Sequence, residues 1–105
     1  MGNKKILKDL KKFKEKLLRN ISVDKIILFG SQVTGKTHKD SDVDLIVVSK
    51  DFEGKKSRYR AIGFYTNWNL DYPVDFLCFT PKEFNKLKNQ ITIVKEAVEN
   101  GIEIK

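Results

Sequence analysis

Cysteine, proline and glycine are all scarce in this sequence, and each scarcity excludes a class of protein. Cys78 is the single cysteine of 105 residues, so no internal disulfide can form and a disulfide-stabilised secreted domain is excluded. Two prolines and six glycines are too few for a collagen-like chain or a Pro/Gly-rich disordered chain. With 40% hydrophobic and 10% aromatic residues, the composition is instead typical of a folded domain.

Long apolar runs are also absent from the sequence. No stretch approaches the roughly 18 consecutive apolar residues that a membrane-spanning helix needs. Charged residues interrupt the first twenty positions too often for the apolar segment of a signal peptide. We therefore expect a cytoplasmic protein with no membrane association, and its length fits one domain over residues 1–105.

Positive charge is concentrated at the N-terminus. Residues 1–20 hold eight Lys and Arg against two Asp and Glu, although the whole chain has 21 against 14. Apolar residues recur there at helical spacing and predict an amphipathic helix over about 4–19: Ile6, Leu10, Phe13 and Leu17. The lysine-rich face of this helix suits nucleic acid or an acidic partner, but a solvated face is the simpler interpretation.

Three apolar segments are typical of strands, at residues 25–29, 42–49 and 73–79. Residues 58–70 have only partial helical spacing, interrupted by Gly63. Thr80, Pro81 and Glu83 form a helix-start signal, and we expect helices over about 81–100 with a break near Asn89. Residues 102–104 alternate and predict a short last strand. The expected fold is α/β (α+β), a small mixed sheet of three to four strands flanked by helices.

Three aspartates lie in or beside the predicted strands. Asp42 and Asp44 are two residues apart at the start of the second strand, so their side chains share one face. Asp75 lies in the third strand, inside a run that looks buried, and converges with them if the two strands are neighbours. Close carboxylates repel one another, and a hard divalent cation such as Mg²⁺ removes that repulsion. The pattern predicts a metal site that is completed by a nucleotide.

Gly30 and Ser31 end the first strand and lead toward a short helix. A glycine there allows a sharp turn and close approach of a ligand to the backbone. Amides at a helix N-terminus bind phosphate, and the Ser31 hydroxyl adds a further hydrogen bond. Phosphate donors and metal-binding acids therefore lie at the same end of the predicted sheet, an arrangement that suits phosphoryl chemistry with one or two metal ions.

The segment Phe29-Gly30-Ser31, followed after ten residues by Asp42-Val43-Asp44, resembles the Gly-Ser-x10-Asp-x-Asp signature of the polymerase-β-like nucleotidyltransferases. Asp75 matches the third acid of this family, and residues 22–80 resemble the catalytic core of its minimal members. The resemblance implies an enzyme with a palm-like sheet, two Mg²⁺ ions and an NTP substrate. It assigns the metals to Asp42, Asp44 and Asp75, deprotonation of the attacking hydroxyl to Asp75, and the triphosphate to Gly30 and Ser31.

The chain departs from the family in two respects. Many relatives have an arginine soon after the Gly-Ser pair, whereas Gln32 to Lys36 contain none, and Lys36 or Lys39 would have to supply the positive charge. Larger relatives also continue into an acceptor-binding domain. We therefore expect a partner or a second copy of this chain to shape the acceptor site.

The resemblance to minimal nucleotidyltransferases implies transfer of AMP from ATP to a hydroxyl. Many such proteins are antitoxins that adenylylate a tyrosine of a small helical HEPN-type ribonuclease toxin. Two alternatives remain open: a catalytically weak antitoxin or scaffold that neutralises its partner by binding, and a nucleic-acid-binding module.

Other residues near the motif have simpler interpretations. Tyr59, Tyr65 and Trp68 can stack on a base, but their spacing favours a place in the core. His38 is more readily an exposed loop residue than a phosphate ligand. A second basic cluster beside the predicted site can grip a triphosphate or an acidic partner, or lie in a solvated loop: Lys55, Lys56, Arg58 and Arg60.

Overall fold

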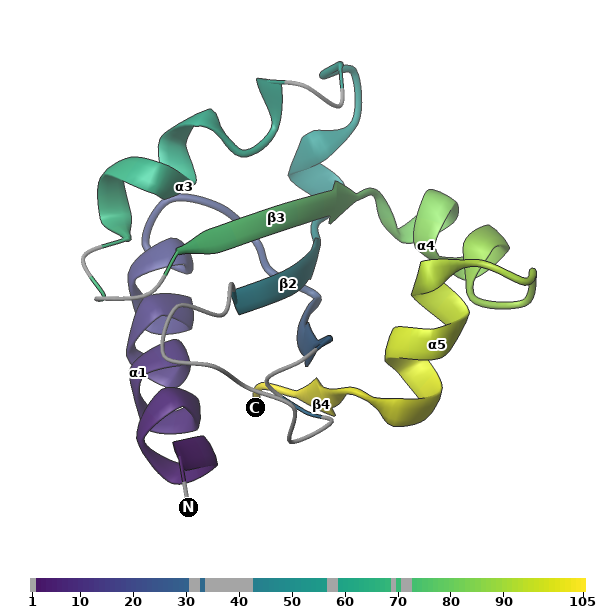
Figure 1. Ribbon diagram of the computed structural model, residues 1–105. Helices are drawn as coiled ribbons and strands as arrows, with labels where there is room; N and C mark the ends of the chain where they lie inside the picture. The colour runs from purple at the N-terminus through teal and green to yellow at the C-terminus, as the bar shows by residue number, and fades with distance from the viewer. Residues whose placement is uncertain (1, 31–32, 34–42, 57–58, 69, 71–72) are drawn as a thin grey trace.

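A four-stranded mixed sheet in the order β3-β2-β1-β4 is the centre of the fold (Figure 1). The computed structural model describes residues 2–30, 33, 43–56, 59–68, 70 and 73–105. Its elements are α1 (Gly2–Leu17), β1 (Lys25–Phe29), β2 (Val43–Val48), the 3₁₀ helix η1 (Lys50–Phe52), α3 (Ile62–Asn67), β3 (Val74–Phe79), α4 (Pro81–Leu87), α5 (Ile93–Asn100) and β4 (Ile102–Glu103). The predicted α/β class with a mixed sheet is confirmed.

Both kinds of strand pairing occur in the sheet. β1 runs antiparallel to β2 and to β4, while β2 and β3 are parallel. The parallel connection from β2 to β3 passes through η1 and α3, and the chain then returns through α4 and α5 to β4, which pairs with β1. β2 therefore lies between a parallel and an antiparallel neighbour, and both of its faces are covered.

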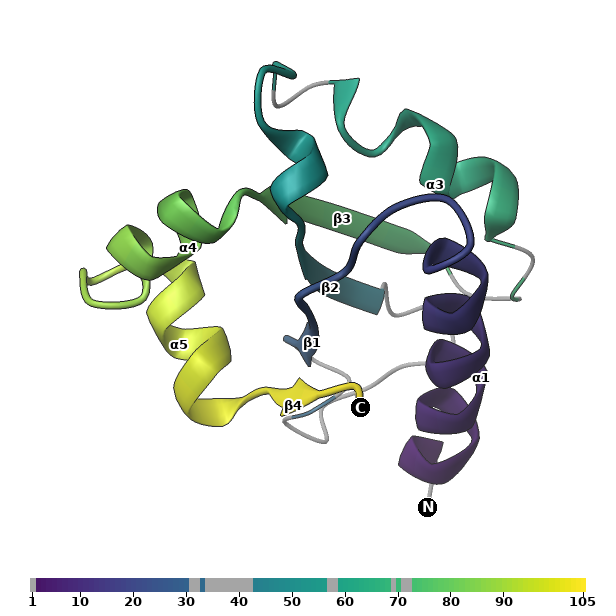
Figure 2. The ribbon, with the colours of Figure 1, turned by 180° about the vertical axis from the view of Figure 1, so that it is seen from behind.

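Helices cover both faces of the sheet, as the two opposite views show (Figures 1 and 2). Alternate strand residues such as Leu28 and Leu45 pack with the buried residues of α1 and with Phe64 of α3. The intervening residues, among them Ile46, pack with Phe84 of α4 and with α5. Two apolar layers of this kind explain why the strands read as continuous apolar runs in the sequence.

The helix α1 buries one stripe and leaves its lysines outside. Ile6, Leu10, Phe13 and Leu17 are at most 3% exposed, while Lys5, Lys8 and Lys12 lie on the solvent side. Lys14 is an exception, because its Nζ donates a hydrogen bond of 3.0 Å to the carbonyl of Ile104. This bond connects the first helix to the last strand. None of the helices in the described part of the chain has the length and apolar character to cross a bilayer.

The aromatic residues of the segment before β3 divide between core and surface. Trp68 packs against Phe13 and Phe76, with ring centroids 5.1 and 5.8 Å apart, so the core interpretation is correct for it. Tyr59 and Tyr65 are about half exposed, and the core interpretation is wrong for both. Tyr65 contacts the edge of the same core, since its ring lies 5.1 Å from that of Phe76.

The C-terminal helices begin and end where the sequence signals indicate. The Thr80 side chain accepts from the Glu83 amide, and the Glu83 carboxylate accepts from the Thr80 amide, which completes a capping box. α5 ends at Asn100, before Gly101. A Cβ on Gly101 would overlap the carbonyl oxygens of Ala97 and Leu28, so only glycine lets the chain pass this closely from α5 into β4.

The structure corrects the prediction that Arg60 belongs to a basic cluster beside the aspartates. Its guanidinium is buried at the carboxyl end of β3, where it makes a bidentate ion pair with Glu83 (Nη1–Oε1 2.6 Å, Nη2–Oε2 3.3 Å). It also donates to the carbonyls of Lys55 and Cys78. The aspartates lie at the opposite end of that strand. Arg58 lies outside the described residues.

Cys78 behaves as the small apolar residue that the sequence predicts. It packs against the α1 side of the core, and burial raises the pKa of its thiol to about 12, although the nearby Arg60 acts in the opposite direction. The thiol is therefore protonated at neutral pH and is a poor nucleophile.

Truncation of Glu83 should destabilise the protein more than the loss of an ordinary surface charge. Glu83→Ala removes the capping box and leaves the buried guanidinium of Arg60 without its counter-ion, so we expect the free energy of unfolding at pH 7 to fall by about 2 kcal/mol. Glu99→Ala is the matched control, because Glu99 is exposed and meets Lys95 only at 3.9 Å. Urea denaturation measures both variants, and equal losses would contradict the role given to Arg60.

The pH dependence of this difference has a defined sign. Hydrogen bonds from Arg60, followed by those from Thr80, hold the pKa of Glu83 below its usual value of 4.5. A carboxyl whose pKa is lower in the folded than in the unfolded protein stabilises the folded state at pH values above its unfolded pKa. This stabilisation is lost as the pH falls through the pKa of the folded state. The gap between wild type and Glu83→Ala should therefore be constant from pH 7 to 5 and narrow below 4.5.

Candidate active site

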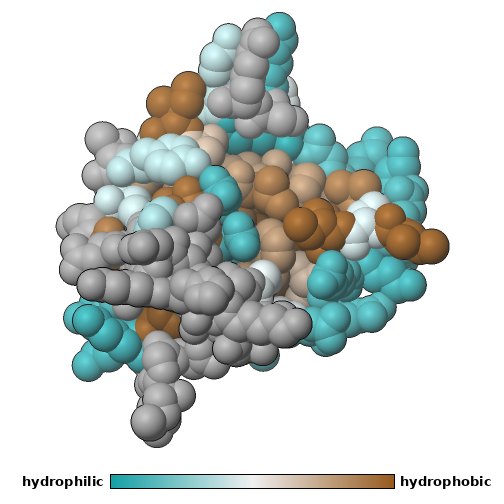
Figure 3. Space-filling model, in the orientation of Figure 1, coloured by the Kyte–Doolittle hydropathy of each residue, from teal (hydrophilic) through white to brown (hydrophobic). Residues whose placement is uncertain are grey.

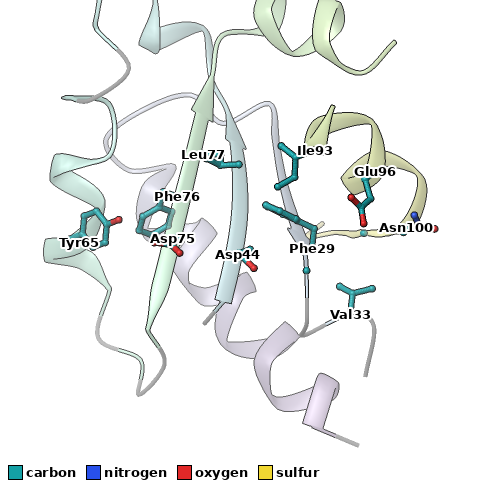
Figure 4. A pocket seen from close by; sticks show the side chains of 12 residues that line it. Phe29, Val33, Asp44, Tyr65, Asp75, Phe76, Leu77, Ile93, Glu96 and Asn100 are labelled. Atoms are coloured by element: carbon teal, nitrogen blue, oxygen red, sulfur yellow. The ribbon is translucent and has the colours of Figure 1, made fainter. Parts of the chain in front are cut away.

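Strand register brings two aspartates side by side at one end of the sheet. Asp44 of β2 is paired with Phe29 of β1 on one side and with Asp75 of β3 on the other. Directly paired residues of neighbouring strands project from the same face, so both carboxylates point to the side on which α4 and α5 lie (Figure 4). The arrangement places Asp44 and Asp75 at the amino ends of β2 and β3, next to the carboxyl end of β1.

The two carboxylates open into a cavity of about 440 Å³. The strands contribute Phe29, Asp44, Asp75 and Leu77 to its lining, and Gly30 lies at the end of β1. α5 forms the facing wall. A cavity of this volume lies within the range of small-ligand sites in proteins.

The backbone at Gly30 passes close to the carboxylate of Asp44. Gly30 has a φ of 81°, in the left-handed region that favours glycine, and it turns the chain out of β1. Its carbonyl accepts a hydrogen bond of 3.0 Å from the amide of Val33, which closes the turn. The positive φ favours glycine here, and a Cβ at this position would overlap Oδ2 of Asp44 and force that carboxylate to shift.

The exposure of the two acids differs from the expectation. Asp44 is partly buried, but Asp75 is exposed, whereas the sequence predicted a buried third acid. Asp75 is the second residue of the edge strand β3, and the cavity in front of it is open to solvent, so an apolar run in the sequence does not bury it. The strand of Asp75 does pair with β2, which was the condition for the two acids to converge.

The remaining predicted site residues, Ser31, Lys36 and Asp42, lie outside the described residues, as does His38. Within the described ranges no three His, Cys, Asp or Glu side chains are close enough together to hold a metal ion. Asp44 and Asp75 alone offer carboxylate oxygens side by side, and oxygen ligands of this kind suit a hard cation such as Mg²⁺. The roles assigned to all these residues stay predictions.

Sequence reasoning missed the contribution of α5 to the cavity. Ile93, Glu96 and Asn100 all line it, and they are spaced at i, i+3 and i+7 along one face of the helix (Figure 4). Val94 and Ala97 are buried against the sheet on the other face. The spacing was present in the sequence, but only the packing of α5 on β1 shows which face meets the aspartates.

The α5 side of the cavity combines the apolar Ile93 with the polar Glu96 and Asn100, and apolar surface continues beyond it. Hydrophobic surface gathers between β3 and the α4–α5 helices in the space-filling view (Figure 3). Ile91, in the turn between these helices, is 99% exposed, and Ile93 is 51% exposed. The cavity thus joins the carboxylates of β2 and β3 to a wall of α5 that is apolar at Ile93 and polar at Glu96 and Asn100.

Sequence comparisons found a family and a relative to which this chain is similar. The family model of the nucleotidyltransferase domain matches residues 10–100 of the chain. A candidate protein adenylyltransferase of Methanocaldococcus jannaschii is 30% identical over 69 residues, which are 66% of this chain and 69% of that protein.

Solved structures share the fold. A candidate nucleotidyltransferase from Sulfolobus solfataricus superimposes with a TM-score of 0.66 at 18% identity, covering 94% of this chain and 78% of that chain, and shows the common fold alone. A chain from the crystal structure of a toxin-antitoxin with AMP-PNP superimposes with a TM-score of 0.56 at 25% identity, covering 90% of this chain and 72% of that chain.

The contact between Gly30 and Asp44 can be tested by substitution. Gly30→Ala adds both the strain of a positive φ and an overlap with the Asp44 carboxylate, so we expect the free energy of unfolding to fall by about 2–4 kcal/mol. Gly54→Ala is the matched control, because Gly54 has the same φ of 81° but nothing within 4 Å of a Cβ, and only about 1–2 kcal/mol should be lost there.

A double substitution isolates the overlap from the strain. In an Asp44→Ala background the carboxylate is gone, and Gly30→Ala should then lower the free energy of unfolding only as much as Gly54→Ala does. Urea denaturation of the four variants gives the coupling. An unchanged loss in the Asp44→Ala background would show that the two residues do not meet.

Proposed function

Because this chain belongs to the nucleotidyltransferase domain family, as a member similar to the minimal nucleotidyltransferases, we propose that it transfers AMP from ATP to a hydroxyl group of a protein. The observation that carries the proposal is the pair of carboxylates, Asp44 and Asp75, beside Gly30 in one cavity. An acid pair next to a glycine turn is the arrangement that a metal-bound nucleotide needs.

The residues have separate roles in this proposal. Asp42, Asp44 and Asp75 hold Mg²⁺, two ions in the full site, and Gly30, Ser31 and Lys36 hold the triphosphate. Mg²⁺, when bound, offsets the repulsion between the carboxylates and the phosphates. Asp75 accepts the proton of the acceptor hydroxyl. The hydroxyl oxygen forms a bond to the α-phosphorus, and the bond between that phosphorus and the pyrophosphate oxygen breaks.

The position of Asp75 suits the role of the base. Of the two carboxylates it is the exposed one, and it lies on the edge strand β3, on the outer side of Asp44. A large acceptor can therefore reach it from solvent, while Asp44 lies deeper between two strands. An accessible carboxylate next to a metal-binding one is what a reaction with a macromolecular acceptor requires.

Two relatives support an adenine nucleotide and a protein acceptor. One is named as a candidate protein adenylyltransferase, and the other comes from a toxin-antitoxin structure with AMP-PNP, an analogue of ATP. We therefore propose that this chain is an antitoxin whose acceptor is a tyrosine of a HEPN-type toxin. The exposed Ile93 on the cavity wall and the exposed Ile91 in the turn before α5 suit contact with such a partner.

Nucleotide binding tests the site without knowledge of the partner. Calorimetry should detect ATP binding in Mg²⁺ and its loss in EDTA. Asp44→Asn should weaken binding roughly tenfold or more in Mg²⁺, because a charged ligand of the metal is lost. Asp24→Asn is the matched control: Asp24 is exposed and lies at the opposite end of the sheet, so binding should be unchanged. Binding by a folded Asp44→Asn protein equal to wild type would contradict the metal site.

Transfer to a partner tests the acceptor. With ATP labelled at the α-phosphate, wild type should label a HEPN-type protein encoded beside it, and Asp75→Asn should lower the rate of labelling by roughly 100-fold or more through loss of the base. ATP should still bind to that variant more tightly than to Asp44→Asn. Neutralisation of the toxin without any labelling, unaffected by Asp44→Asn, would favour neutralisation by binding alone.

A further inference from the structure

Glu96 lies in the cavity but has no part in the chemistry proposed above. It is on α5, on the wall that faces the strands, and its carboxylate is directed toward the cavity (Figure 4). Among the residues that the structure describes, no basic side chain pairs with it, in contrast to Glu83 and Glu99. A carboxylate held there without a counter-ion is available to a ligand.

The charge of Glu96 restricts which part of a nucleotide can meet it. A carboxylate repels phosphate oxygens, so the triphosphate cannot occupy the α5 side of the cavity without a cation between them. The strand side already offers Asp44, Asp75 and the turn at Gly30 for metal-bound phosphate. The α5 side must therefore take a neutral part of the ligand that has hydrogen-bond donors.

Apart from the turn at Gly30, the lining between the two sides is apolar. Phe29 and Leu77 project from the sheet, and Ile93 faces them from α5, one turn before Glu96. The order across the cavity is a carboxylate row, an apolar middle and a single carboxylate. A nucleotide has a matching order, with phosphates at one end, a flat ring that favours apolar contact, and amino donors on the edge of that ring.

We infer that Glu96 selects the base of the nucleotide by accepting a hydrogen bond from its exocyclic amino group. For ATP this group is the N6 amino of adenine, with the ring against Phe29, Leu77 and Ile93. The inference rests on the proposed function, because it takes the ligand of the cavity to be a nucleotide. It adds a residue for base specificity to a site whose other members act on phosphate and metal.

The amino group can be removed from the ligand without changing anything else. Purine riboside triphosphate is ATP without the N6 amino group, so the ratio of the two dissociation constants in Mg²⁺ measures the contact. We expect wild type to bind ATP roughly tenfold or more tightly than purine riboside triphosphate, as a hydrogen bond to a charged group predicts. Glu96→Ala should bring this ratio close to one, chiefly by weakening ATP.

Glu99→Ala is the control variant. Glu99 is on the same helix and carries the same charge, but its side chain is exposed at the surface and pairs with Lys95. The ratio for this variant should equal that of wild type. Both replacements are at exposed positions, so we expect both variants to melt at the wild-type temperature. Thermal melting therefore checks that α5 is still folded.

The outcomes separate this inference from the function beneath it. A ratio that Glu96→Ala leaves unchanged overturns the role of Glu96, even where ATP binding still requires Mg²⁺ and Asp44. Tighter binding of both nucleotides and of inorganic tripolyphosphate to Glu96→Ala also overturns it, because Glu96 would then face phosphate. Failure of wild type to bind ATP in Mg²⁺ overturns the proposed function and the inference together.

Discussion

The pairing register of β2 with both of its neighbours is the constraint on which the candidate site depends. Asp44 is opposite Phe29 in the antiparallel pair and opposite Asp75 in the parallel pair. A slip of one residue in either pair would turn a carboxylate toward the apolar layer beneath α1. The register is held because Val43 and Leu45 are fully buried in that layer, so exchanging them for Asp44 would bury a charge in place of apolar surface.

The turn after β1 couples the backbone to this register. Gly30 has a left-handed conformation and lies against the carboxylate of Asp44, so the path of the chain and the position of the acid are set together. Gly101 has a similar effect at the next strand, where α5 passes close to β1 before β4 begins. Two glycines thus allow a helix wall and an acid pair to meet at one end of a narrow sheet.

Local signals in the sequence predicted most elements, and long-range placement accounts for what they missed. The strand segments, the capping box at Thr80 and the break between α4 and α5 follow from apolar runs and neighbouring residues, which act over a few positions. The burial of Arg60 and the exposure of Asp75 depend on which end of β3 each one meets. The facing of Glu96 toward the cavity depends on the packing of α5, which no local spacing specifies.

The position of Arg60 makes the two ends of β3 different in their charged contacts. At the carboxyl end of β3, Arg60 pairs with Glu83 and donates to two carbonyls, and these bonds stabilise the fold there. At the amino end, Asp75 has no such cation beside it among the described residues. A guanidinium in the cavity would occupy the carboxylate oxygens that a divalent ion needs. Because Arg60 is buried at the far end, its guanidinium does not compete for the carboxylate oxygens of the cavity, and these oxygens can serve the metal-bound nucleotide of the proposed function.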